Sequence, residues 1–135
     1  MSKLVTVNIE NYNEGGFKSY RIPGIVVSSK GTIIVYYETR LSAYDDWSAM
    51  GIGMKRSTDQ GKTFSNRQMI AISEDLAVNN PVMIASQDGR IHFLWQKDYR
   101  QLFYQVSTDD GLTFSDPVSI LDAVTAFKEE YCWSL

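Results

Sequence analysis

The sequence predicts an all-β fold of two four-stranded antiparallel sheets in tandem. A nine-residue segment occurs twice, long runs of β-branched and aromatic residues lie between the copies, and no segment has a convincing helical period. Aromatic residues make up 13% of the 135 residues, beside only 3 prolines and 9 glycines. This composition is typical of β-strands joined by short turns.

The internal repeat defines the units. Residues 57–65 read STDQGKTFS and residues 107–115 read STDDGLTFS, an offset of 50 residues. Upstream of each copy a proline precedes a glycine by 8 residues, Pro23 with Gly31 and Pro81 with Gly89. Each unit therefore contains a short strand, a glycine turn, a long strand, a third strand, the nonapeptide turn and a fourth strand.

Four-stranded units that repeat at about 50 residues indicate blades of a β-propeller. The expected strands lie at 24–28, 32–38, 50–56 and 67–72, and then at 82–86, 90–96, 102–107 and 117–121. We place blade 1 at about 20–75, blade 2 at about 78–122 and the start of a further blade in the tail 123–135. Because a propeller has about four to eight blades, residues 1–135 are expected to form an incomplete domain.

Charge and hydropathy exclude several classes of function. The net charge of −3 argues against nucleic acid as a partner. No apolar run approaches the roughly 18 residues of a membrane-spanning helix. No signal peptide is visible, which makes the cytoplasm the default while the localisation stays open. The single cysteine, Cys132, has no partner for a disulfide and no zinc-ligand spacing. We expect no metal and no cofactor.

The nonapeptide is interpreted as a structural turn. An aspartate two residues before a glycine favours a turn in which the carboxylate binds backbone amides and the glycine adopts positive φ. Calcium binding is the alternative, but a calcium site needs several carboxylates and each turn supplies too few. The structural residues are Ser57, Asp59, Gly61, Thr63 and Phe64 in the first copy, and Ser107, Asp109, Gly111, Thr113 and Phe114 in the second.

An insertion distinguishes the first unit from the second. Gly31 and Ser57 are 26 residues apart, whereas Gly89 and Ser107 are only 18 residues apart. The extra residues fall between the second and third strands, within residues 40–48. Insertions in repeat proteins form loops on one face, which is commonly the binding face. This loop is therefore the first candidate for a functional site.

Three motifs in order resemble one family. The nonapeptide resembles the Asp-box of bacterial neuraminidase repeats, and residues 20–23, YRIP, resemble the Arg-Ile-Pro motif of exo-α-sialidases. Residues 38–40, ETR, with Asp46 six residues later, resemble the segment that carries the second arginine and the acid/base loop. The chain thus resembles the N-terminal portion of an exo-α-sialidase. The resemblance implies a six-bladed propeller that hydrolyses terminal sialic acids, with a sialylated glycan as substrate.

The resemblance also implies roles for the charged residues. Arg21 is the first of three arginines that hold the substrate carboxylate, because a planar guanidinium donates two parallel hydrogen bonds to one carboxylate. Asp46 is the general acid/base, and the adjacent Asp45 is the second candidate. Without the motifs, Arg21 is interpreted as a surface arginine beside a strand and Asp46 as a solvated loop residue.

Four further residues are expected to contact the substrate or support the site. Arg40 faces sugar hydroxyls, with Glu38 beside it. Asn80 stands where bacterial relatives have an aspartate before a proline, which changes the expected substrate preference more than the class of activity. Trp47 helps to exclude water from Asp46.

The rest of the site is expected in later blades. Sialidases use a tyrosine nucleophile, and the resemblance places that tyrosine, its partner glutamate and two further arginines beyond residue 135. The chain alone is therefore expected to be inactive, with missing blades or self-association covering its exposed sheet faces. The alternative is a non-catalytic, carbohydrate-binding Asp-box propeller that several copies complete by oligomerisation.

Overall fold

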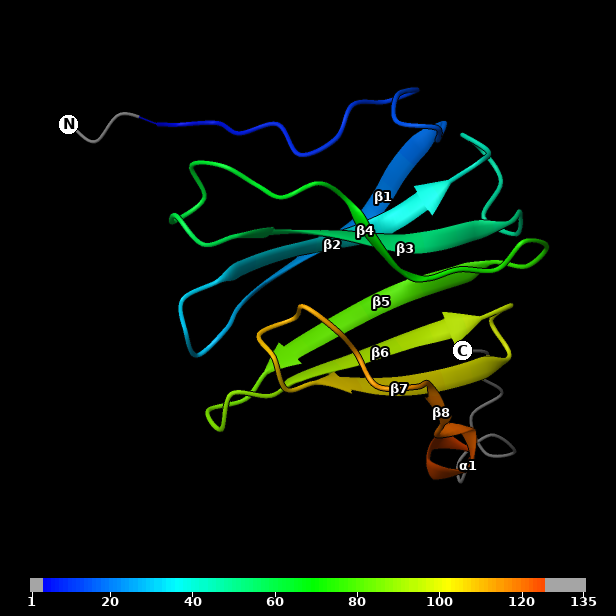
Figure 1. Ribbon diagram of the computed structural model, residues 1–135. Coiled ribbons are helices and arrows are strands. Elements are labelled where there is room, and N and C mark those ends of the chain that lie inside the picture. Colours follow the sequence, from blue (N-terminus) through cyan, green and yellow to red (C-terminus); the bar gives the residue numbers. More distant parts are fainter. Residues whose placement is uncertain (1–3, 126–135) are drawn as a thin grey trace.

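Two four-stranded antiparallel sheets stack face to face in a computed structural model that describes residues 4–125 (Figure 1). The strand orders are β1-β2-β3-β4 and β5-β6-β7-β8, so each sheet is a simple meander. This arrangement confirms the expected all-β class and its two four-stranded blades. The strands are β1 (Ser19–Val27), β2 (Ile33–Arg40), β3 (Met50–Ser57), β4 (Gln68–Ala71), β5 (Val78–Ala85), β6 (Ile91–Lys97), β7 (Gln101–Ser107) and β8 (Val118–Ser119).

The first strand of each sheet contains a β-bulge at its proline. Both strands begin upstream of the position expected from the sequence. The register shifts between Arg21 and Gly24 in β1 and between Asn79 and Val82 in β5. The residue before each proline, Ile22 or Asn80, has a φ of +50°. Since a bulge tolerates the missing N–H of proline, the strand continues past it instead of starting after it.

The core lies between the two sheets. Its fully buried side chains come from both, namely Ile34, Ile52, Met54, Val78, Ile91 and Phe93, each at most 1% exposed. Tyr36 joins the sheets directly, because the main-chain N–H of Met83 donates a 3.1 Å hydrogen bond to its hydroxyl. The Tyr36 ring crosses β1 at Gly24, where a Cβ atom would lie only 2.1 Å from the ring.

The two nonapeptide turns have the same hydrogen-bond pattern. In the second copy the Asp109 carboxylate accepts bonds from the Thr113 main-chain N–H at 2.9 Å and from Ser107 Oγ at 2.8 Å. In the first copy the corresponding bonds to Asp59 measure 2.9 and 2.8 Å. The hydrogen bonds from Thr113 lower the pKa of Asp109 to about 2. Each aspartate is thus engaged within its own turn.

The second turn also binds the first sheet. Oδ2 of Asp110 accepts hydrogen bonds from Thr32 Oγ1 at 2.6 Å and from Arg56 Nη2 at 3.0 Å. In the first turn the equivalent position is Gln60. The contact between the sheets is therefore polar at this edge and apolar at its centre.

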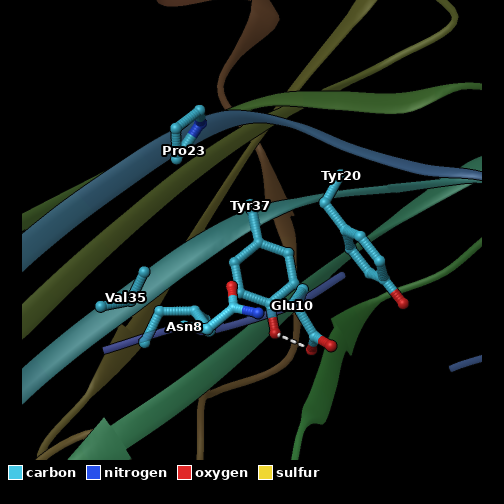
Figure 2. Close-up of a pocket in the computed structure, with 7 residues that line it drawn as sticks. Asn8, Glu10, Tyr20, Pro23, Val35 and Tyr37 are labelled. Carbon is cyan, nitrogen blue, oxygen red and sulfur yellow. Dashed lines mark hydrogen bonds between the residues drawn. The ribbon is translucent and has the colours of Figure 1, made fainter. Parts of the chain in front are cut away.

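The N-terminal segment covers the outer face of the first sheet, on the side away from the second sheet (Figure 1). Glu10 anchors it, accepting a 2.5 Å hydrogen bond from Tyr37 and forming ion pairs with Lys55 and Arg67 at 3.3 and 3.2 Å. A pocket of about 210 Å³ lies beneath the segment. Tyr37 and Glu10 both line this pocket, and Figure 2 shows the hydrogen bond between them. The polar side chains that line it are already engaged in hydrogen bonds, with one another or with neighbouring residues.

The described residues end in a short helix, α1 (Leu121–Val124). It follows β8, which is shorter than the strand expected at 117–121. Most of the tail in which the start of a further blade was expected, and Cys132 with it, lies outside the described residues. Residues 4–125 contain no helix of the length and apolarity that crossing a membrane requires. Their two sheets do not close into a ring, consistent with an incomplete propeller.

Candidate active site

Two arginines from neighbouring strands meet on one carboxylate oxygen. Arg21 lies in β1 and Arg40 ends β2, while Asp46 lies in the inserted loop between β2 and β3. Nη1 of Arg21 is 3.1 Å from Oδ1 of Asp46. Nη1 of Arg40 donates a hydrogen bond to the same oxygen. The structure thus brings Arg21, from one sequence motif, together with Arg40 and Asp46, from another.

Glu38 fixes the orientation of Arg40. The two residues are two positions apart on β2, so their side chains leave the same face of the strand. Oε2 of Glu38 accepts hydrogen bonds from Nε and Nη2 of Arg40 at 2.8 and 2.5 Å, and the side chains are only 1% and 2% exposed. Burial favours the neutral guanidinium, but hydrogen bonds to Asp46 and Glu38 outweigh this effect and raise the pKa of Arg40. Arg40 is therefore a fixed, charged group.

Asp46 is an ionised carboxylate in this arrangement. The hydrogen bond from Arg40, with the positive charges of Arg40 and Arg21, holds the pKa of Asp46 below its ordinary value. The side chains of Asp46 and Arg21 are 54% and 49% exposed, so solvent reaches both. The cluster therefore presents one buried and one accessible guanidinium, which together bind a carboxylate.

Asn80 reaches this cluster from the second sheet. Its main-chain N–H donates a 2.9 Å hydrogen bond to Oε1 of Glu38, and its side-chain amide donates a 2.7 Å bond to Gln96. Asn80 is thus linked to Arg40 through Glu38. The neighbouring Asn79 is fully buried, and within residues 4–125 no hydrogen bond reaches its side-chain amide.

Asp45 has a different role from Asp46. Its carboxylate accepts a 2.9 Å hydrogen bond from the main-chain N–H of Trp47, which closes a turn within the loop. No ion pair involves Asp45 in the part of the chain that the structure describes. Of the two adjacent aspartates, only Asp46 contacts the arginines.

Tyr99 is a member of the site that sequence reasoning missed. It lies in the turn between β6 and β7, and its hydroxyl donates a 2.9 Å hydrogen bond to the main-chain carbonyl of Asp46, 53 residues earlier. Its ring centroid is 4.4 Å from that of Trp47. The available signal was topological, since this turn occupies in its sheet the place that the inserted loop occupies in the first.

Comparisons with known proteins show which proteins the chain is similar to. A sialidase of Clostridium perfringens is 39% identical over 94% of the chain, and one of Bacteroides fragilis is 28% identical over 87%. The chain is homologous to these sialidases over most of its own length. It spans 38% and 27% of the length of these two relatives, and no protein-family model matches it.

Solved sialidase structures share the fold. The Hadza microbial sialidase Hz136 superposes with a TM-score of 0.75 over 83% of the chain and 28% of its own length, at 24% identity. The Trypanosoma rangeli sialidase in complex with sialic acid superposes with a TM-score of 0.65 at 19% identity, over 79% of the chain and 21% of its own length. The two stacked sheets of this chain are thus propeller blades.

Proposed function

We propose that the chain is the N-terminal part of an exo-α-sialidase that hydrolyses terminal sialic acids from glycoconjugates. The convergence of Arg21 and Arg40 on one carboxylate, in a chain homologous to sialidases, carries this proposal. The proposed site lies on blade 1, residues 20–75. Blade 2, residues 78–122, packs against blade 1 and supports the site. The substrate would be a glycan that ends in sialic acid.

The substrate carboxylate would take the place of Asp46 on Arg21. The side chains of Arg21 and Asp46 are each about half exposed, so the exchange of one carboxylate for the other leaves the core intact. Arg40 is held by Glu38 and would stay in place, facing the hydroxyl groups of the sugar. Asp46 would leave Arg40 as well, whose hydrogen bond is the main cause of its low pKa, and away from both arginines the pKa of Asp46 rises.

This exchange would convert Asp46 into the general acid. Its pKa is depressed in the unliganded site, which is the wrong direction for a group that must donate a proton. With substrate bound, Asp46 takes up a proton from solvent and gives it to the glycosidic oxygen as the bond from that oxygen to the anomeric carbon breaks. A tyrosine outside residues 1–135 would form the new bond to that carbon, and Asp46 would later act as base toward water.

Hydrolysis of a fluorogenic sialoside tests the proposal. The assay compares the 135-residue chain with the product of the longest open reading frame that encodes it. We expect turnover from the longer protein alone, because the chain supplies only Arg21, Arg40 and Asp46 of the site. Turnover by the 135-residue chain would contradict this division of the site. Sialic acid binding by the longer protein without turnover would support a non-catalytic binding propeller instead.

A further inference from the structure

The loop that carries Asp46 is held by the second sheet as well as by the first. From the first sheet, Arg21 and Arg40 bind the Asp46 side chain. From the second, the Tyr99 hydroxyl binds the Asp46 main-chain carbonyl at 2.9 Å. The two attachments act on different atoms of the same residue, so one can be released while the other remains.

An aromatic contact enlarges the second attachment. Trp47, the residue after Asp46, packs on the Tyr99 ring with a centroid distance of 4.4 Å and an interplanar angle of 50°. Trp47 is 65% exposed, so the Tyr99 ring covers one side of an indole that otherwise faces solvent. Aromatic pairs of this kind contribute beyond the area that they bury. Ring and hydroxyl of Tyr99 thus contact two consecutive loop residues.

The backbone at Tyr99 is unusual for a tyrosine. Asp98 and Tyr99 have φ of +53° and +54°, and the turn is closed by a 3.1 Å hydrogen bond from the Arg100 N–H to the Lys97 carbonyl. Two consecutive residues at positive φ favour asparagine, aspartate and glycine, whereas a bulky side chain rarely adopts this conformation. The contacts of the Tyr99 hydroxyl with Asp46 and of its ring with Trp47 explain why a tyrosine occupies this position.

We propose that Tyr99 is a positioning residue for the acid/base Asp46, an inference that rests on the proposed function. Tyr99 holds the main chain of the loop, so Asp46 stays above the site when a substrate carboxylate replaces it on Arg21. Because the hydroxyl binds the carbonyl and not the carboxylate, proton transfer by Asp46 leaves this hold intact. Without Tyr99, the released carboxyl group would move away with the loop.

Fluorine NMR of the 135-residue chain tests the contact itself, without any need for activity. The chain has three tryptophans, and 5-fluorotryptophan labelling with Trp47→Phe assigns the resonance of Trp47. We expect Tyr99→Asn, which suits positive φ, to move this resonance to the position of a solvated indole. Tyr12→Phe, at an exposed tyrosine of the N-terminal segment, should leave it unchanged. A Trp47 resonance unaffected by Tyr99→Asn would overturn the proposal.

Kinetics of the longer protein test the positioning role. Tyr99→Phe removes only the hydroxyl, and we expect kcat for a sialyl-sugar to fall about tenfold, a fraction of what general acid catalysis contributes. For an aryl sialoside, whose leaving group needs little protonation, kcat should fall much less. KM should change little for either substrate. Equal losses for both substrates, or none, would contradict the proposal. If the unsubstituted longer protein were inactive, the proposed function would fail, and the NMR result would still decide the contact.

Discussion

The main-chain N–H of Asn80 donates a hydrogen bond to Oε1 of Glu38, 2.9 Å away, across the boundary between the two sheets. Oε2 of the same carboxylate holds Arg40. One fully buried side chain therefore joins the second sheet to the arginine of the first. The geometry of the candidate active site depends on the packing of the two blades.

Glu38→Gln should destabilise the chain strongly. The glutamine oxygen can still accept the bond from Asn80, but its amide group would face the Arg40 donors, and the buried guanidinium would lose an anionic partner. Breaking a buried ion pair in this way costs about 3 kcal/mol. Urea unfolding of the 135-residue chain measures the change, with the exposed Glu74→Gln as control. Equal stability of the two variants would contradict the role of Glu38.

Gly24→Ala should separate the two sheets at Tyr36. The added methyl group would lie 2.1 Å from the Tyr36 ring, which must then move and release the Met83 N–H. Overpacking of this kind costs about 1–3 kcal/mol. A double-mutant cycle with Tyr36→Ala measures the coupling. Without the ring, Gly24→Ala should cost little, and identical costs in both backgrounds would count against the clash.

Asp110→Asn should weaken the contact between the second nonapeptide turn and the first sheet. Asp110 accepts bonds from Thr32 and Arg56, and the loss of a hydrogen-bonded charge costs about 2 kcal/mol. Gln60→Asn, at the same position of the first turn, is the matched control. Thermal unfolding compares the two, and we expect a lower midpoint for Asp110→Asn alone. A shift of the same size in both variants would show that the turn, and not the contact, is affected.

Acid should destabilise the chain partly through Asp109. Its folded-state pKa of about 2 lies below the ordinary 3.8, so its ionised form stabilises the fold above that ordinary value. This stability is lost as the pH falls from about 5 to about 2. The midpoint of thermal unfolding, measured across this pH window, should fall less steeply with decreasing pH for Asp109→Asn than for the unsubstituted chain. The exposed Asp116→Asn should follow the unsubstituted chain, and a common slope for all three would exclude the effect.

Local patterns in the sequence predicted most of the fold. The repeat and its turn signals identified both sheets, because each blade is built from neighbouring strands and short turns. The starts of β1 and β5 were expected too late, since a proline normally ends or begins a strand. The bulges that carry these strands past Pro23 and Pro81 depend on positive φ at Ile22 and Asn80. Isoleucine rarely adopts this conformation, and an asparagine, which favours it, does not by itself predict a bulge.

The site was predictable only where motifs were local. Arg21, Arg40 and Asp46 lie within one blade and follow a recognisable spacing. Tyr99 and the Asn80 main chain reach the site from the other blade, through contacts between residues 53 and 42 positions apart. Such contacts depend on how the two sheets stack, and side-chain patterns along one strand do not encode that stacking.

The most direct test of the central claim compares the two neighbouring aspartates of the inserted loop. Hydrolysis of a sialyl-sugar is measured for Asp46→Asn and Asp45→Asn in the product of the longest open reading frame. Because only Asp46 contacts the arginines, we expect Asp46→Asn to lower kcat by about 10²-fold or more. Asp45→Asn should retain most of the activity. Full activity of Asp46→Asn, or a larger loss in Asp45→Asn, would contradict the account.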